Sequence, residues 1–435
     1  MRSKFVLLLV LGGIAWALRA PVGGMVFYAW ITLFRPQDFT YLPLPNLVPV
    51  AVAILVFSLL SGLARKKLKF CWNIGAFYLC SILFACFLSF CFSSTQAAAW
   101  EKLVQVFKIL LPSILICISI SSKKDLKTII MTYAISIGIW GIQAAVHGLL
   151  RGGAVENMSI GGQMSERNGF ALGVMMTWPM WYYFGLLAEK KLHKYFFFGG
   201  SFFVGLCVIV SNSRGVMLAL GLLLTLNFMR KNTKRWRNLA LVVFLGPALI
   251  PLIPDYAIER LQTIEVGAEQ TDGSAQSRLI LMKAGIDGAL DHPVFGVGAG
   301  CWGLHYHNYV EAMGDGAYEP HSIWIKIAAE TGFIGLGVYL FMFGRVIMTL
   351  RKIQRLSLRE NNMSPYHYAG MLQLSLIGYC AAGTFSNQIF FEYMFLIIAT
   401  SGAFIRLWKS GDFAAVQQEN KAVRETGTPQ CSVGI

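Results

Sequence analysis

The chain has 435 residues, of which 56% are hydrophobic and only 14% are charged, and its mean hydropathy is +0.57. Soluble domains carry roughly 25% charged residues, so this composition excludes an ordinary soluble globular protein. The formal net charge of +15 is spread over short segments between apolar runs, and we therefore expect no nucleic-acid partner. The composition predicts an all-α protein that crosses the lipid bilayer many times.

The first apolar stretch, residues 5–34, is interrupted by Arg19-Ala20-Pro21. It can form one broken crossing or two short ones, because a full crossing needs about 20 apolar residues. Pro21 directly after Ala20, with further apolar segments behind it, favours a retained membrane segment over a cleaved signal peptide.

Further apolar segments follow along the chain, and each is predicted to cross the bilayer. They are residues 47–64, 71–92, 103–121, 126–150, 168–187, 195–211, 214–229, 238–254, 322–349, 368–388 and 389–408. Together with the first stretch they give about 12 transmembrane helices.

The segments between these helices alternate in charge. Basic residues are concentrated in Arg65-Lys66-Lys67, Lys123-Lys124, Lys190-Lys191, Arg230 to Arg237 and Arg351 to Arg359. By the positive-inside rule these segments face the cytoplasm. The alternating segments, which are poor in Lys and Arg for their length, are 35–46, 93–102, 151–167, 211–214 and 255–321. We expect them to face outward.

This pattern divides the chain into four parts. Residues 1–254 are predicted to form the N-terminal transmembrane helices, and residues 255–321 one large outward-facing loop with short helices. Residues 322–408 are predicted to form the C-terminal transmembrane helices. The polar end, residues 409–435, has the composition of a disordered cytoplasmic tail.

The large loop has structure of its own. Ser274 can cap a helix that runs through Ile286 and ends at Asp291-His292-Pro293. The glycines from Gly296 to Gly300 then form a flexible turn. They match a nucleotide-binding loop only weakly, because no strand precedes them, and we favour a hinge or a site of close packing.

Three arginines lie where a phosphate could approach from outside. Arg167 and Arg214 stand at the outer ends of predicted crossings, and Arg278 lies in the loop helix. A guanidinium group binds phosphate oxygens bidentately, so these side chains are candidates for a phosphate clamp. Interface arginines that extend their charge to water, or a salt-bridged Arg278, are the alternatives.

The crossing after the large loop opens with Pro320-His321-Ser322. His321 is a candidate general base because His titrates near neutral pH, and a helix-cap or interface histidine is the alternative. Ser322, Lys326 and Glu330 follow on one helical face. Ionisable residues inside a crossing are costly and indicate function, although a mutual ion pair that locks helix packing would also explain them.

The sequence lacks the usual signs of a metal or nucleotide site. His305 and His307 have no third ligand at a suitable spacing. The chain contains no Asp-x-Asp pair and no Walker A pattern. We therefore expect no metal and no cofactor.

Taken in order, several short motifs resemble the O-antigen ligase and O-antigen polymerase superfamily. They are Arg167-Asn168-Gly169-Phe170-Ala171-Leu172, Ser213-Arg214-Gly215, Ser274-Ala275-Gln276-Ser277-Arg278, Asp291-His292-Pro293-Val294-Phe295-Gly296-Val297-Gly298, Pro320-His321-Ser322-Ile323-Trp324 and Glu330-Thr331-Gly332-Phe333-Ile334-Gly335-Leu336. The N-terminal part, with Leu18-Arg19-Ala20-Pro21 and Phe34-Arg35-Pro36-Gln37-Asp38, is similar to putative O-glycosylation ligases associated with exosortase systems.

The resemblance implies a metal-independent, inverting glycosyltransferase of the bacterial inner membrane, with its active site facing the periplasm. The implied donor is a glycan on undecaprenyl pyrophosphate, and the acceptor is a hydroxyl of another glycan, of lipid A core or of a protein. The family's essential histidine maps onto His321 and its arginines onto Arg214 and Arg278. The residues expected to bind substrate are Arg167, Asn168, Ser322, Lys326 and Glu330.

Other interpretations remain open. A ligase and a polymerase share donor and fold, and only the acceptor separates them. A transporter or flippase for a lipid-linked or anionic solute would also use outward-facing arginines and a buried Lys326 and Glu330. A non-catalytic scaffold for envelope assembly would need none of these side chains.

Overall fold

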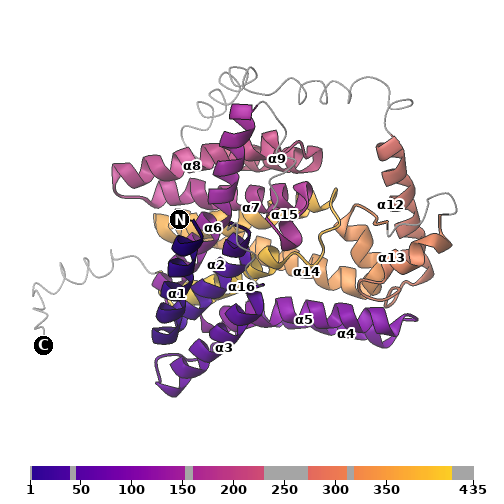
Figure 1. Ribbon diagram of the computed structural model, residues 1–435, viewed down its shortest axis with the longest axis horizontal. Coiled ribbons are helices and arrows are strands. Elements are labelled where there is room, and N and C mark those ends of the chain that lie inside the picture. The colour runs from indigo at the N-terminus through magenta and orange to yellow at the C-terminus, as the bar shows by residue number, and fades with distance from the viewer. Residues whose placement is uncertain (1, 40–45, 152–159, 230–272, 311–317, 414–435) are drawn as a thin grey trace, which may run out of the picture.

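The computed structural model describes residues 2–39, 46–151, 160–229, 273–310 and 318–413, and every regular element in these ranges is a helix (Figure 1). The expected crossing 238–254, the basic segment Arg230 to Arg237 and most of the predicted tail lie outside these ranges. The α-helices are α1 (Arg2–Arg19), α2 (Pro21–Phe34), α3 (Val48–Ala64), α4 (Ile74–Cys91), α5 (Gln96–Ser119), α6 (Lys123–Arg151), α7 (Arg167–Leu187), α8 (Lys191–Val210), α9 (Arg214–Met229), α12 (Gly273–Asp291), α13 (Trp302–His305), α14 (Ile323–Arg359), α15 (Met363–Gly383) and α16 (Glu392–Lys409). Short 3-10 turns are η1 (Pro36–Phe39), η2 (Gly162–Met164) and η4 (Tyr306–Asn308).

Five of the described helices, α4, α5, α6, α8 and α14, are long and apolar enough to cross a membrane. Shorter apolar helices are α2, α3, α9 and residues 6–19 of α1. Large apolar side chains such as Leu8 (68% exposed) and Phe84 (60% exposed) point away from the protein. Exposed apolar side chains of this size are unfavourable in water but favourable in contact with lipid. The protein is therefore a multi-pass membrane protein.

Three helices that length and apolarity alone do not select, α7, α15 and α16, form the interior of the bundle. Most of their residues are buried by other helices. Because they contact protein, they can carry polar groups whose hydrogen bonds are satisfied within the bundle. Gln373 donates to the Ile347 carbonyl at 3.0 Å, and Ser375 donates to the Met176 carbonyl at 2.6 Å. The total of about 12 crossings stays a prediction.

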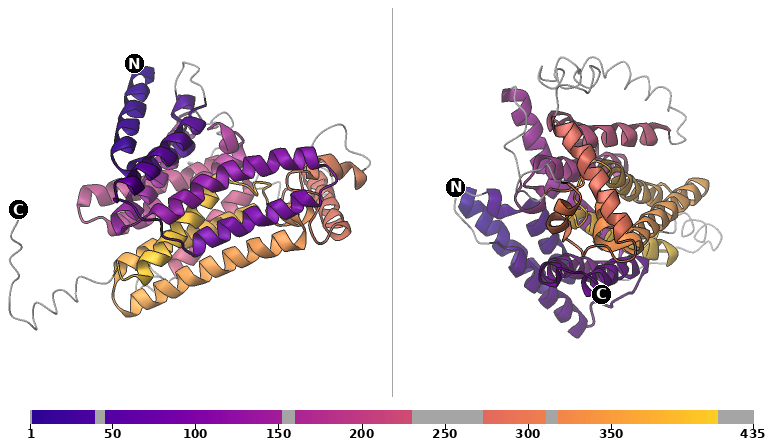
Figure 2. Two further views of the ribbon diagram at one scale, coloured as in Figure 1. Left: turned by 90° about the horizontal axis from the view of Figure 1, so that it is seen from below. Right: turned by 90° about the vertical axis from the view of Figure 1, so that its right-hand side faces the viewer.

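The ambiguous stretch 5–34 forms two helices. The break is at Ala20, which is extended, and Pro21 takes the first helical position of α2, where its missing N–H costs nothing. The Ala20 carbonyl accepts a hydrogen bond from Ser58 of α3 at 3.2 Å. Figure 2 shows α1 lying across the direction of α5 and α14, so the number of crossings in this stretch stays open.

Several helices differ in length from the predicted crossings. α5 begins at Gln96 rather than 103, and α14 continues to Arg359 rather than 349. The basic segment Arg351 to Arg359 is thus the end of a helix and no connecting loop. The cause is that a helix can continue beyond the apolar layer as long as its backbone hydrogen bonds are made, whereas apolarity marks only the part in lipid.

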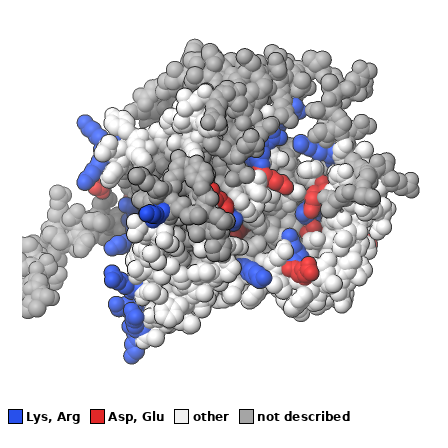
Figure 3. Space-filling model, viewed as in Figure 1, with Lys and Arg blue, Asp and Glu red and all other residues white. Residues whose placement is uncertain are grey.

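The basic junctions lie together at one end of the bundle. Arg19 and Arg65 line one small pocket with Lys67. Arg406, in the last turn of α16, donates to the Ile120 carbonyl next to the start of α6. In Figure 3 many of the Lys and Arg atoms lie along the left edge, and others lie in the middle and right of the view, where most of the acidic atoms are. Basic segments that are far apart in the sequence therefore lie close together in the folded protein.

Candidate functional site

His321 lies immediately before α14 in an unusual backbone conformation. Its φ is 46°, in the left-handed region that non-glycine residues seldom adopt and that often marks functional positions. Ser322, which follows as the N-cap of α14, is extended, and its carbonyl accepts the Lys326 N–H at 2.9 Å. This turn holds the imidazole, which is half-buried, at the end of the bundle opposite the basic junctions.

The pKa of His321 is lowered from its usual value of 6.5, first by burial and then by the positive charge of Arg278. Glu319 and Glu166 oppose this shift, and Lys326 adds to it more weakly. Charges on α12, α14 and the start of α7 therefore act on one imidazole. The net lowering favours the neutral ring at neutral pH, which is the form that accepts a proton.

Arg278 is positioned by the packing of α12 against α14. A Cβ at Gly285 would lie 2.6 Å from Ile325 Cγ2 and 3.1 Å from Pro320 Cβ, so only glycine permits this approach. Arg278 lies about two turns before Gly285, on the same side of α12. Its side chain is exposed, which leaves it accessible to a ligand. The predicted helix of the large loop is confirmed by α12.

Arg167 and Asn168 form the first turn of α7 and are half-buried. The preceding turn is fixed by Gln163, whose amide donates to the Phe390 carbonyl at 2.6 Å and accepts the Glu392 N–H at 2.7 Å. This pair of bonds holds the start of α7 against the start of α16. Since Glu166 acts on His321, the Arg167 turn lies near the same site.

Arg214 is the first residue of α9 and is also half-buried. The next residue, Gly215, packs on Phe385 in the connection between α15 and α16. That connection in turn touches α14, because Trp324 donates to Thr384 at 3.3 Å. Arg214 therefore lies at the same end of the bundle as His321.

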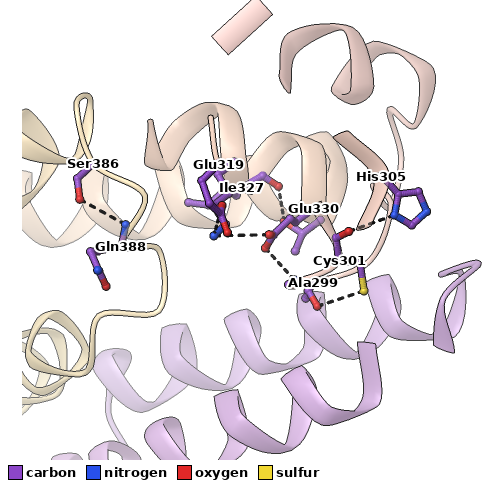
Figure 4. A network of polar contacts seen from close by, with 11 residues as sticks. Ala299, Cys301, His305, Glu319, Ile327, Glu330, Ser386 and Gln388 are labelled. Carbon is purple, nitrogen blue, oxygen red and sulfur yellow. Dashed lines mark hydrogen bonds and ion pairs between the residues drawn. The ribbon is translucent and has the colours of Figure 1, made fainter. Parts of the chain in front are cut away.

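Lys326 and Glu330 belong to a chain of charged groups beneath His321. The Lys326 ammonium forms an ion pair with Glu319, and it lies 3.8 Å from the Glu330 carboxylate. The other Glu330 oxygen accepts the Gly300 N–H at 2.8 Å. Figure 4 shows this chain running from Glu319 to Ala299. Lys326 and Glu330 therefore share one face of α14, as predicted, whereas Ser322 precedes the helix. The ammonium already has two protein partners.

The glycine segment of the large loop packs into a break in α14. At Gly332 φ is 67° and the helical path is interrupted, so nearby backbone groups need partners outside the helix. Val297 and Gly298 donate to the carbonyls of Ala329 and Glu330 at 2.9 and 3.0 Å, and Phe333 donates to Pro293 at 2.7 Å. These hydrogen bonds support the interpretation as close packing.

Most of the residues described above lie in a segment that matches a known family. Residues 199–340 match the O-antigen ligase family. The resemblance to the O-antigen ligase superfamily, predicted from the motifs, is thereby confirmed. The matched segment contains Arg214, Arg278, His321, Lys326 and Glu330.

The N-terminal part has a separate match. Residues 1–178, which include Arg167 and Asn168, match a family of unknown function. The predicted similarity of this part to exosortase-associated ligases therefore stays a prediction. No curated protein matches the chain.

The described residues contain no cluster of three or more His, Cys, Asp or Glu side chains suited to a metal. His305 is engaged otherwise, with Ser94 Oγ at 3.1 Å from one ring nitrogen and the Cys301 carbonyl at 3.1 Å from the other. His307 packs against the ring of Tyr306, with 3.8 Å between ring centroids. Neither histidine gives support to a metal site.

Three charged residues of this site do not stand out in the sequence. Glu319 pairs with Lys326, Glu166 acts on His321, and Lys102 of α5 acts on Glu330. Glu319 directly precedes the Pro320 motif and Glu166 directly precedes the Arg167 motif, so their positions next to these motifs could have identified them as candidates. Lys102 lies next to no motif in the sequence, and only the packing of α5 brings it close to the site.

Proposed function

We propose that this protein is a membrane glycosyltransferase that moves a glycan from undecaprenyl pyrophosphate to an acceptor hydroxyl, as an O-antigen ligase or a polysaccharide polymerase does. The observation that carries the proposal is that Arg278 acts electrostatically on the half-buried His321, whose pKa is lowered, and that both residues lie in the segment that matches the O-antigen ligase family. A base and a phosphate-binding cation are the two groups that such a transfer needs.

The reaction follows from these two groups. His321 accepts the proton of the acceptor hydroxyl as its oxygen attacks the anomeric carbon. The bond from that carbon to the pyrophosphate oxygen breaks, and the lipid pyrophosphate leaves with the bonding electrons. Arg278 and Arg214 stabilise the charge that develops on it. One displacement inverts the anomeric carbon, and the arginines supply the positive charge without a metal.

The other predicted residues have supporting roles. Arg167 and Asn168 stand in the half-buried first turn of α7, near His321, and can reach the donor or the acceptor. Ser322 adjoins His321 and can contact the acceptor. The ion pairs of Lys326 favour a role for Lys326 and Glu330 in holding His321 and the Gly300 backbone in place, in preference to direct substrate contact.

The same proposal orients the protein. The basic junctions face the cytoplasm, as the positive-inside rule requires, and His321 at the opposite end faces the periplasm. Residues 255–321 then form the large periplasmic loop between the transmembrane parts 1–254 and 322–408, and 409–435 form a cytoplasmic tail. This arrangement places about 12 crossings in the bacterial inner membrane.

Replacement of His321 by Ala tests the proposal. Without the base we expect glycan transfer in isolated membranes to fall by about 10²- to 10⁴-fold. His193→Ala, at an exposed position at the start of α8, is the matched control and should transfer at the parental rate. If His321→Ala transfers glycan as fast as the parent, His321 is not the base.

A further inference from the structure

Lys102 is a further cation near the site, and among the described residues no anionic group is in contact with its ammonium. It lies in the second turn of α5, at the end of that helix nearest the large loop, and is half-buried. Its side-chain stem packs directly on the Gly300 backbone, where no Cβ would fit. Its Nζ lies 5.4 Å from the centroid of the Phe390 ring.

Both surfaces that hold Lys102 are themselves fixed. Gly300 is tied to the buried Glu330 carboxylate at 2.8 Å. Phe390 is buried, and its carbonyl accepts the Gln163 amide at 2.6 Å. The ammonium group is therefore held in place between the glycine segment and the start of α16, which reduces the entropy lost when a ligand binds.

The ammonium retains its hydrogen-bonding capacity. It has three N–H donors, and a cation–π contact satisfies none of them as an acceptor oxygen would. Within the described ranges, Lys102 Nζ forms no hydrogen bond or ion pair, whereas the Lys326 ammonium has Glu319 and Glu330. Lys102 does act on Glu330 electrostatically, so it belongs to the same group of charges.

We propose that Lys102 binds a phosphate group of the lipid diphosphate donor, in addition to the arginines Arg214 and Arg278. This inference rests on the proposed function, because it takes the donor to be a lipid diphosphate. The ammonium of a lysine binds phosphate as a point charge with freely rotating donors. Lys102 would thus add a third cation from α5, a helix outside the segment that matches the O-antigen ligase family.

Binding of farnesyl diphosphate and of farnesol to the purified protein in detergent tests this assignment. Lys102→Met keeps the apolar stem that packs on Gly300 and removes the charge. We expect Lys102→Met to weaken farnesyl diphosphate binding by about 10-fold or more and to leave farnesol binding unchanged. Lys102→Arg should restore most of the affinity. Lys108→Met, at an exposed position on the same helix, is the control and should bind both compounds like the parent.

The outcomes separate the two proposals. Unchanged diphosphate binding in Lys102→Met, with a parent that binds it, overturns the role of Lys102 and leaves the proposed function standing. Equal weakening for farnesol and farnesyl diphosphate also overturns it, because that result indicates a role in packing alone. A parent that does not bind the diphosphate contradicts the proposed donor and with it the role of Lys102.

Discussion

The protonation of His321 is controlled by charges that come from three separate parts of the chain. Arg278 and Lys326 lower its pKa, whereas Glu319 and Glu166 raise it. Burial has the largest effect and acts in the same direction as Arg278. The imidazole is therefore tuned as a base by its surroundings, and a change in one neighbour should change the pH range over which it works.

Replacement of Arg278 by Gln should move the acid limb of the pH–activity profile to higher pH. The positive charge of Arg278 lowers the pKa of His321, so its removal raises that pKa. The neutral, base-competent ring exists above the pKa, so activity is lost at a higher pH as the solution is acidified. The measurement is the transfer rate as a function of pH, scaled to its own maximum.

Glu319→Gln is a control that should shift the pH–activity profile in the opposite direction. Glu319 raises the pKa of His321, so its neutralisation should move the acid limb to lower pH. Shifts in opposite directions would support His321 as the titrating group. If both variants keep the parental limb, another group controls the acid side and the assignment of His321 as base fails.

At the residue scale, the sequence predicted the groups that have a characteristic chemistry and a motif around them, such as His321 and Arg278. It did not predict Glu319, Glu166 or Lys102. Their importance comes from contacts between helices far apart in the sequence. Nothing in the residues around Lys102 indicates that α5 brings it against Gly300.

At the scale of elements, the break in α14 holds the large loop to the transmembrane helices. The backbone at Gly332 has φ 67° and ψ −176°, a conformation essentially restricted to glycine. Gly332 also lies so close to the Val294 carbonyl that no Cβ would fit. The same break exposes the carbonyls that bind Val297 and Gly298.

Gly332→Ala should therefore destabilise the protein and reduce transfer together. The backbone strain alone costs on the order of 1–3 kcal/mol, and the contact with Val294 adds to it. We expect a lower melting temperature in detergent and weaker activity, because the loop that carries Gly300 is displaced. Gly337→Ala is the matched control, since this position of α14 has open space around it and alanine favours a helix by about 0.5–1 kcal/mol. Equal melting temperatures for the two variants would contradict the role of the break.

The sequence predicted most helices of the bundle and missed this break. Long apolar runs identify a crossing because the bilayer imposes length and apolarity. They contain no information on an interruption whose hydrogen bonds are made by a distant loop. The sequence places residues 330–336 inside one crossing. The backbone angles of Gly332 and the hydrogen bond from Phe333 to Pro293 show the break.

At the scale of the whole molecule, the separation of the basic junctions from His321 defines two faces. Cysteines introduced on the two faces should therefore react with a membrane-impermeant reagent from opposite sides of the membrane. In a chain with Cys91 replaced by Ser, Leu304→Cys on α13 should react with a membrane-impermeant maleimide in intact cells with a permeabilised outer membrane. Lys66→Cys should react only after the inner membrane is broken. Both positions are exposed in the protein. Labelling of Lys66→Cys in intact cells would reverse the proposed orientation.

The central claim is that the outward site forms a new glycosidic bond. The most direct measurement combines the purified protein in proteoliposomes with an undecaprenyl-pyrophosphate-linked glycan, candidate acceptors and EDTA, and determines the mass of the product. The account predicts an acceptor heavier by one transferred glycan, released undecaprenyl pyrophosphate, and neither product with His321→Ala. A donor that crosses the bilayer with its glycan still attached, and no acceptor of increased mass, would contradict the account and indicate a transporter.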